Sequence, residues 1–599
     1  MSTATVNVTL GEALPEAQLH LQSGSGLTNA LVALVPLAAL LYLIRQWALP
    51  KPIPGIPYKP DSVKSMLGDF QAIGKYLASA NVTYFDWIEK QAKDLNSPII
   101  QVFPRPFGKP TVVVSDFNEA QDILMRRGKE FDRSYVSAEI FTGIIPDHHI
   151  VHKTDSAWKS QRRLLQDLMS PGFLEGVAAP VLYQTVSDFV RMWELKAQAA
   201  QRRPFKASED IYYTALDSVH GFAFGQDFKH NANQPTLEYL ERTVSEATNA
   251  PDNGGSIDEP IDFPRQEMDV VIKSFLRIID MFAEVQGSPI AKLKWPILNR
   301  LPSFVKAKEI RQETIRKEIQ GALERTETHP DPKTVRSAVD HMVRRELILA
   351  EKEGRPANCF SPAIFDEIFG FVVAGHDTTS TTISWGVKFL ADNPRAQDRL
   401  RAAMQEGFSA AKEEGRPPTV HEIISTNIPY LDASQEEILR CAGTSQTTDR
   451  EAMMDTEILG HKIPKGTIVI MPIDGASVKT PAFNIEESSR HRSSQEAIKS
   501  GRARRYWDAA DVSEFKPERW LSENGEFDAT SGPAMAFSLG TRSCFGKRLA
   551  NIQLRMLLTL IVWNFELQKC PEKLSGYGHK MGLTTEPMDC YVRLRKIEL

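Results

Sequence analysis

The ten residues FSLGTRSCFG at positions 537–546 constrain this chain more than any other stretch of its sequence. The two glycines allow a tight loop and a close backbone approach to a flat ligand, and Arg542 carries a planar cationic fork that suits a carboxylate. Apolar residues then recur at helical spacing over 549–563, which predicts a helix directly after the loop. Cys544 is therefore expected near a helix N-terminus, where backbone N–H groups favour a thiolate, a soft ligand for iron.

The segment resembles the haem-binding loop of the cytochrome P-450 family, and the likeness extends over roughly residues 50–599. The positions of the family pattern Phe-x-x-Gly-x-Arg-x-Cys-x-Gly are occupied here by Phe537, Gly540, Arg542, Cys544 and Gly546. The resemblance implies a haem cofactor (heme b) whose iron is axially ligated by Cys544, with thiolate donation that favours O–O cleavage. It also implies a mainly α-helical fold with a small β-rich lobe, which we place near residues 61–115 and 455–480.

A second motif, AGHDTTS, lies in a helical run expected between Ser361 and Asn393. By itself, this run is a buried helix in which threonine hydroxyls bond to its own carbonyl groups. The resemblance implies a more specific function, in which this helix crosses the face of the haem opposite Cys544. Ala374 and Gly375 would leave room for O₂, Thr378 would hydrogen-bond the oxygen, and Asp377 would relay protons.

A third motif places Glu437 and Arg440 three residues apart, on the same side of a helix. Alone, such a pair is a common surface contact that contributes little to stability. The run resembles the Glu-x-x-Arg helix of the family, and FKPERW resembles the segment that sends a second arginine, Arg519, to it. The three residues are therefore expected to form a structural triad and not a catalytic one.

Two weaker matches suggest where the haem propionates bind. WKSQR puts Trp158 and Arg162 about one helical turn apart, and REAMMDTEILGHKIPKGT begins with Arg450. With Arg542, the resemblance implies that these arginines pair with the propionates, although each alone is equally well read as a solvated side chain. His461 is an alternative iron ligand by residue type, but it lies in a turn-like stretch without supporting context.

The N-terminal region reads as a membrane anchor. Residues 1–26 contain no Lys or Arg, and residues 27–49 supply about the twenty apolar residues that a membrane helix needs. A cleaved signal peptide is disfavoured because no basic region precedes the apolar stretch, and a buried core helix is the other alternative. Since Arg45 near the end of this stretch and Lys51 and Lys59 after it are basic, the positive-inside rule predicts a single-pass protein with a lumenal tail at 1–26, glycosylated at Asn7, and a cytosolic catalytic domain in the endoplasmic reticulum membrane.

The rest of the chain divides into a proline-rich linker at 50–60 and a haem-thiolate monooxygenase domain at 61–599. Residues 479–505 are polar, Ser-rich and basic, which is typical of an exposed inserted loop; a partner-docking function for it stays open. The net charge of −5 gives no indication of a nucleic-acid partner. The five scattered cysteines indicate free thiols in a reducing compartment.

The resemblance implies an oxidoreductase that inserts one oxygen atom of O₂ into a lipophilic organic substrate, in the manner of fungal enzymes of secondary metabolism. Because no flavin domain is fused to it, electrons from NADPH would come from a separate NADPH–cytochrome P-450 reductase, docked near Lys547 and Arg548. A haem-thiolate isomerase or dehydratase, or a non-catalytic haem-binding membrane protein, are the alternatives. The pocket loops, expected near 141–151 and 205–305, carry no charge that demands a charged ligand.

Overall fold

The computed structural model divides the chain into two compact units, Met1–Leu49 and Pro50–Leu599. The predicted tail before residue 26 and the Asn7 sequon lie outside the described residues. The structure describes residues 26–79, 82–246, 256–286 and 291–598.

The first unit contains helix α1 (Gly26–Ala48), whose side chains are described from Leu34 onward. Its described apolar side chains from Leu34 to Trp47 are exposed, whereas Ala48 at its end is buried. Among the helices whose side chains are described, none combines the length and the apolarity that crossing a bilayer requires.

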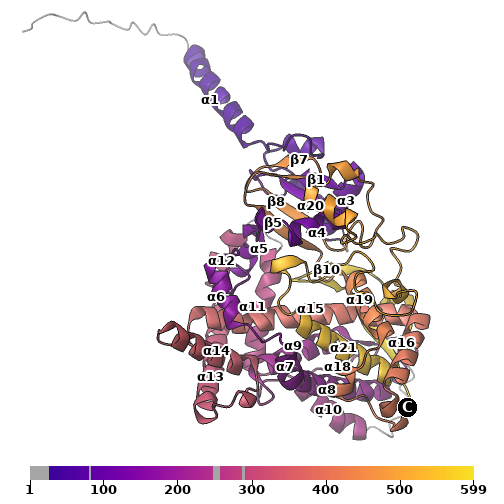
Figure 1. Cartoon of the computed structure of the whole chain (residues 1–599). Coiled ribbons are helices and arrows are strands. Elements are labelled where there is room, and N and C mark those ends of the chain that lie inside the picture. The colour runs from indigo at the N-terminus through magenta and orange to yellow at the C-terminus, as the bar shows by residue number, and fades with distance from the viewer. Residues whose placement is uncertain (1–25, 80–81, 247–255, 287–290, 599) are drawn as a thin grey trace, which may run out of the picture. The chain divides into compact units, whose positions relative to one another are not determined.

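The second unit has a β-rich part and a larger helical part, which are both visible in Figure 1. The main sheet has the strand order β1-β2-β8-β5-β3, with β2 and β8 parallel and the other pairs antiparallel. This sheet confirms the predicted β-rich lobe and adds β5 and β3 to it. Its strands are β1 (Ile99–Val102), β2 (Thr111–Val114), β3 (Phe131–Asp132), β5 (Thr447–Ala452) and β8 (Ile468–Pro472).

The expected linker at 50–60 belongs to this second unit and packs on the lobe. Ile53 and Ile56 are buried, and the Gln101 side chain in β1 hydrogen-bonds to the backbone of both. The segment is therefore held against the sheet and is not a free spacer, because the two isoleucines between its prolines bury apolar surface.

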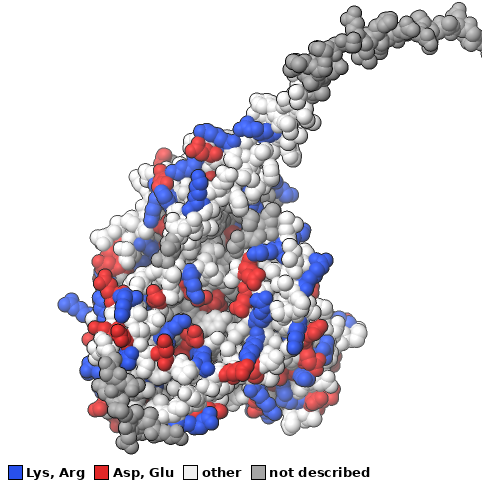
Figure 2. Space-filling model, turned by 180° about the vertical axis from the view of Figure 1, so that it is seen from behind, with Lys and Arg blue, Asp and Glu red and all other residues white. Residues whose placement is uncertain are grey.

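The helical part is organised around α15 (Pro362–Asp392), which packs along α9 (Ser208–Phe224). Ser361 stands at the predicted N-cap position in extended conformation, but its side chain makes no capping hydrogen bond. Residues 222–225, expected in a pocket-shaping loop, instead include the buried end of α9. Acidic and basic side chains are interspersed over the face shown in Figure 2.

The remaining helices surround this pair or flank the sheet (Figure 1). They are α2 (Phe70–Leu77), α3 (Tyr84–Leu95), α4 (Phe117–Met125), α5 (Tyr135–Phe141), α6 (Ser156–Leu164), α7 (Pro171–Phe173), α8 (Ala179–Ala200), α10 (Gln234–Glu246), α11 (Val270–Gln286), α12 (Ala291–Leu298), α13 (Pro302–Thr328), α14 (Ala338–Glu353), α16 (Pro394–Gly407), α17 (Ser409–Glu413), α18 (Val420–Ser425), α19 (Pro429–Ala442), α20 (Arg492–Lys499) and α21 (Lys547–Asn564).

Three small sheets complete the described part of the unit, and most of their strands lie in the last 35 residues or in the segment 456–463. β4, β12 and β9 form one sheet, β10 pairs with β11, and β6 pairs with β7. The strands are β4 (Phe205–Lys206), β6 (Thr456–Ile458), β7 (His461–Ile463), β9 (Phe565–Gln568), β10 (His579–Met581), β11 (Thr585–Pro587) and β12 (Tyr591–Lys596).

The segment 479–505, expected as an exposed loop, is in part folded against the lobe. It contains α20, which packs against α4. Arg490, only 3% exposed, pairs with Asp116 at 2.6 Å, and Ser493 donates to Asp122 at 2.7 Å. The exposed-loop prediction was wrong here because buried carboxylates of the α4 region need partners, and the basic and hydroxyl side chains of this segment supply them.

We expect Arg490→Ala to lower the thermal stability of the protein markedly. The change leaves the buried Asp116 carboxylate without its cation, which costs about 3–5 kcal/mol. Arg492→Ala is the matched control, because Arg492 is exposed and its pair with Glu496 is worth at most about 1 kcal/mol. Equal unfolding temperatures for the two variants would contradict the docked position of this segment.

Candidate functional site

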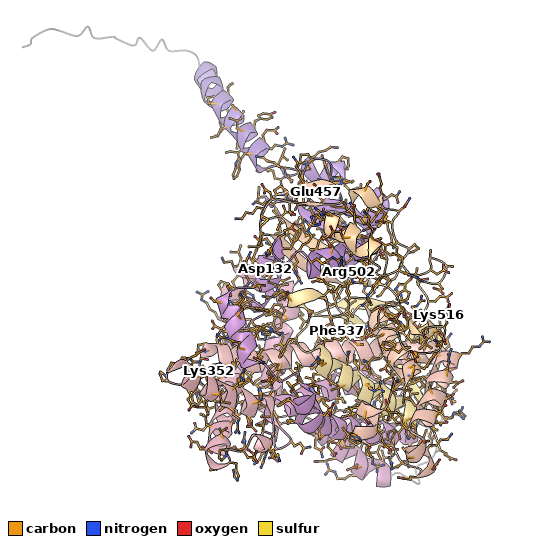
Figure 3. All side chains as sticks on the ribbon, viewed as in Figure 1. Asp132, Lys352, Glu457, Arg502, Lys516 and Phe537 are labelled. Atoms are coloured by element: carbon orange, nitrogen blue, oxygen red, sulfur yellow. The ribbon has the colours of Figure 1, made fainter. Side chains whose placement is uncertain are left out.

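The cysteine loop is closed by its own backbone. The Cys544 N–H donates to the Phe537 carbonyl oxygen at 2.9 Å, and α21 begins three residues after the cysteine. Gly540 has a positive φ of 74°, and a Cβ there would collide with the Leu124 carbonyl at the end of α4. Glycine is thus required at 540, whereas a Cβ at Gly546 would meet no atom within 4 Å. Phe537 is labelled in the middle of the unit in Figure 3.

The Cys544 side chain is accessible, yet the protein around it still removes much of its hydration. This desolvation raises the pKa of the Cys544 thiol. The backbone N–H groups of Gly546 and Lys547 and the charges of Arg162 and Lys547 act in the opposite direction. The predicted thiolate-favouring groups are therefore present but outweighed by desolvation, so that binding of a metal ion would have to displace the thiol proton.

One face of α15 is accessible although the rest of the helix is buried. Between Ile364 and Leu390, only Phe371, Ala374, Gly375 and Thr378 are not buried. Their spacing places them on one side of the helix, so we call them the α15 stripe. Sequence analysis had singled out the last three but not Phe371, whose aromatic side chain carries no local signal of function.

Close packing of two helices also restricts position 375 to glycine. A Cβ at this position would collide with the Val219 side chain of α9. The glycine therefore allows α9 and α15 to pack closely, a requirement that the sequence motif did not reveal.

Thr378 and Asp377 are neighbours in sequence but have different partners. The Thr378 hydroxyl donates to the Ala374 carbonyl oxygen at 2.9 Å, as expected for a threonine in a buried helix. The Asp377 carboxylate accepts from the Thr584 hydroxyl at 2.9 Å, and that hydroxyl lies 2.7 Å from the Thr381 hydroxyl. Thr584 was not identified from the sequence, because it lies 207 residues further along the chain.

The surroundings of Asp377 make it easy to protonate. Burial raises the pKa of Asp377 to about 7, and the charge of Glu586 adds to this. The hydrogen bond from Thr584 and the charge of Lys580 oppose the increase. Near neutral pH the group can therefore hold or release a proton.

Four arginines, at positions 133, 162, 450 and 542, lie close enough to perturb one another. Burial lowers the pKa of Arg542 to about 9, and the charges of Arg133, Arg450 and Arg162 lower it further, while Asp132 opposes them. Burial likewise lowers the pKa of Arg450 to about 10, again with Arg133 adding to the effect. Three of the four were predicted, whereas Arg133 was not.

This arginine cluster has spare hydrogen-bond donors. Arg450 donates through Nη1 to the Asp449 carbonyl oxygen at 2.7 Å, but its buried Nη2 has no partner, and neither has the buried Nε of Arg133. The Trp158 ring lies beneath two of the guanidinium groups, 4.9 Å from that of Arg542 and 5.7 Å from that of Arg162. Buried unpaired donors on like-charged groups fit an anion with several oxygen atoms.

The predicted triad is also brought together. Arg440 donates to both Glu437 oxygens at 2.8 and 2.7 Å, and Arg519 donates to one of them at 3.0 Å. Trp520, which the sequence did not indicate, adds an indole N–H at 2.9 Å. Hydrogen bonds from Arg440 and the two arginine charges hold the pKa of the buried Glu437 below its usual range in spite of desolvation.

A groove of about 840 Å³ lies beside Phe545, the residue after the cysteine. It is bordered by exposed basic side chains of α6 and α21. Its lining comprises Ser156, Trp158, Lys159, Arg162, Arg163, Gln166, Asp167, Met169, Ser170, Pro171, Phe545 and Arg548.

These features together fit haem and define a class of protein. A cysteine sulfur can ligate iron, the accessible α15 stripe is free to face a flat ligand, and the spare N–H groups of Arg450 and Arg133 suit its carboxylates. His461, the alternative iron ligand, lies instead in the β6–β7 hairpin. The cysteine loop, the α15 stripe and the arginine cluster together are characteristic of a haem-thiolate protein.

Comparison with known proteins gives the same class of protein. The family model described as Cytochrome P450 matches residues 88–480 and 500–588. The chain is 43% identical over 578 residues to cytochrome P450 monooxygenase TRI13 of Fusarium sporotrichioides, covering 93% of this chain and 98% of the relative. It is 38% identical to cytochrome P450 monooxygenase GME11363 of Pestalotiopsis microspora, over 96% of this chain and 99% of the relative. It is 32% identical to cytochrome P450 monooxygenase xilC of Penicillium crustosum, over 93% of this chain and 94% of the relative.

The chain belongs to the cytochrome P450 family. It is a haem-dependent monooxygenase, an oxidoreductase that inserts one oxygen atom of O₂ into a lipophilic organic substrate, and the predicted family and reaction class are confirmed. The family match omits 481–499, which lies within the docked segment that contains α20.

We expect Asp377→Asn to stabilise the protein relative to wild type more at pH 8 than at pH 5. The folded pKa of Asp377 is about 7, well above the ordinary aspartate value of about 3.8, so folding stability falls as pH rises between these values. The amide removes this loss, which is worth up to about 4 kcal/mol. Thermal unfolding at several pH values measures the difference. Asp61→Asn is the control, because the exposed Asp61 stays ionised over the whole range; a difference that does not grow with pH would contradict the buried-carboxyl assignment.

Proposed function

We propose that Cys544 is the axial ligand of the haem iron and that the arginine cluster binds the propionates. The proposal is carried by the unpaired buried N–H groups of Arg450 and Arg133, which need an anion. Arg542 and Arg162 add charge, and Trp158 supports both guanidinium groups. Bound haem supplies the activation of O₂, which no protein side chain provides.

The protein's own contribution is then to orient the reactants, exclude water and deliver protons. Thr378 places a hydroxyl on the accessible stripe; while its proton is directed to Ala374, its oxygen can accept a hydrogen bond from water beside the oxygen substrate. Asp377, with a pKa of about 7, stores the proton that this route consumes and regains it between turnovers. Burial of α15 on its other sides keeps bulk water away from this route.

The electron donor in this proposal is a separate membrane-bound NADPH–cytochrome P-450 reductase. Members of the family take electrons from a redox partner, and the groove beside Phe545 is the surface that we assign to it. Exposed Lys159, Arg163, Lys547 and Arg548 give this region positive charge that suits an acidic partner.

We further propose that residues 27–49 anchor the protein in the endoplasmic reticulum membrane, with the tail in the lumen and the monooxygenase domain in the cytosol. Support comes from the continuous apolar sequence, the exposed apolar side chains of α1, and the basic residues that follow it. The substrate proposed is a lipophilic secondary metabolite, since similar proteins from several fungi are monooxygenases.

Thr378→Ala tests the proposed proton delivery. We expect haem content and substrate binding to stay near wild type, while product formed per NADPH consumed falls and more hydrogen peroxide is released. The reason is that the alanine cannot hold the water that brings protons to oxygen. Reconstitution with the reductase, with NADPH, peroxide and product measured together, gives the ratio.

Cys544→Ser is the companion variant, and it should lose the thiolate-type ferrous–CO spectrum that Thr378→Ala retains. Unchanged coupling in Thr378→Ala would contradict the proton route. If the wild type itself consumes no O₂, the isomerase, dehydratase or non-catalytic alternatives would replace the monooxygenase assignment.

The topology makes a separate prediction for the two glycosylation sequons. Asn7 should carry glycan in microsomes, whereas Asn81, which has the same Asn-x-Thr form but stands after the anchor, should not. Asn7→Gln and Asn81→Gln variants, treated with glycosidase and compared by mass, separate the two sites. A glycan on Asn81 alone would mean that the orientation is reversed.

A further inference from the structure

A buried carboxylate on α15 binds a pair of neighbouring histidines. Glu367 accepts the His149 backbone N–H at 2.7 Å and faces His149 Nδ1 at 2.8 Å and His148 Nε2 at 3.2 Å. All three residues lie outside the motifs that the sequence analysis used. Among the described residues they are also the one group of histidine, cysteine and acidic side chains close enough to share a metal ion.

The hydrogen bonds of His148 argue against a metal. Its Nδ1 accepts the Ile150 backbone N–H at 3.1 Å, so the proton of the neutral ring is on Nε2. With the proton on Nε2, which lies 3.2 Å from Glu367, this nitrogen has no lone pair for a metal ion. Glu367 and His149 therefore form a hydrogen-bonded anchor between α15 and the segment 146–154, and His148 lies against this anchor.

The His148 ring lies very close to the backbone of α15. A Cβ at Gly370 would collide with the His148 imidazole, so only glycine lets the ring lie against α15 at this point. Asp366, the residue before Glu367, accepts the Asp147 backbone N–H at 2.8 Å. Two consecutive acidic residues of α15 thus hold two consecutive parts of the same segment.

The same segment holds Arg542 of the cysteine loop. The Arg542 guanidinium donates to the His152 carbonyl oxygen at 2.9 Å and to the His149 carbonyl oxygen at 3.4 Å. The His149 ring also meets the ring of Phe545, next to the cysteine, with centroids 6.1 Å apart. Glu367 therefore reaches Arg542 through one residue, His149.

We propose that Glu367 is a positioning residue for the haem: through His149 and the segment 146–154 it holds the Arg542 guanidinium where a propionate can bind. The inference rests on the proposed haem-binding function of Arg542 and adds α15 to the elements that control it. It assigns to the buried acidic end of α15 a function distinct from that of the α15 stripe.

The contact between Glu367 and His149 persists whether the Glu367 carboxyl group is ionised or protonated. Burial lowers the pKa values of His148 and His149 to about 3, so both rings are neutral under ordinary conditions. Burial raises the pKa of Glu367, while His148, the His149 amide and Arg162 oppose this. A carboxylate accepts the His149 Nδ1 proton, and a carboxylic acid donates to the same nitrogen, so the two residues stay joined in either state.

The test uses the haem-loaded full-length protein and two readouts other than turnover: the rate of haem transfer to excess apomyoglobin and the haem reduction potential. In Glu367→Gln the amide cannot satisfy the donors as a carboxylate does, and a hydrogen bond to a charged group is worth enough to change rates about tenfold or more. We expect haem release to be about tenfold faster and the potential to shift negative, because the Arg542 charge is then less well placed.

A double-mutant cycle with Arg542→Ala separates positioning from general loosening. If Glu367 acts through Arg542, adding Glu367→Gln to Arg542→Ala should change neither readout further. Additive effects, or normal readouts in Glu367→Gln alone, overturn the proposal. Normal readouts in Arg542→Ala would instead overturn the proposed propionate site on which it rests.

Glu346→Gln is the matched control. Glu346 is a largely buried carboxylate on α14 that binds Arg355 and the Asn358 backbone N–H, with no contact to the cysteine loop. It should lower the unfolding temperature without moving the potential. If Glu367→Gln does not fold, His149→Leu removes the ring contacts to Glu367 and Phe545 but keeps the backbone N–H contact, and it should shift both readouts in the same direction; failure to shift either one overturns the proposal.

Discussion

The burial of α15 is the packing constraint on which the rest of this structure depends. A long helix can be enclosed only if its neighbours approach closely, and Gly375 and Gly370 permit this where Val219 and His148 lie against it. One stripe of the helix stays accessible, so the same element both organises the core and presents Thr378 for chemistry. Enclosure on the other sides is also what raises the pKa of Asp377, because desolvation disfavours its charged form.

Buried charges join parts of the chain that are far apart in sequence. Leaving such a charge without a partner is expensive, so each one ties two segments together strongly. Arg490 ties the docked segment to α4, and Arg519 ties the segment before the cysteine loop to Glu437 on α19. The arginine cluster differs, because Arg450 keeps an unpaired donor in the interior. That unmet requirement makes the cluster suitable for a dianionic cofactor.

The elements that could be predicted from the sequence are those whose signal is local. Cys544 could be predicted because glycines, an arginine and a following helix surround it, and Glu437 and Arg440 because their spacing matches the Glu-x-x-Arg helix that the sequence resembles. Arg133 and Thr584 could not be predicted, because they carry no pattern of their own and become important through neighbours that are distant in the chain. The segment 479–505 was predicted as an exposed loop, because its polar composition is the same whether its charged side chains contact water or buried partners.

Residue type and spacing were thus enough to locate the candidate cysteine ligand, and the resemblance that the motifs carry implied the family, the reaction class and the mainly helical fold with its β-rich lobe. These follow from short patterns whose chemistry is intrinsic to the residues in them. Only the tertiary structure decided which partner each side chain has: Thr584 for Asp377, and the two histidines for Glu367. Burial and pairing depend on segments that meet only when the chain folds, and desolvation gives a residue its final pKa after those contacts have formed.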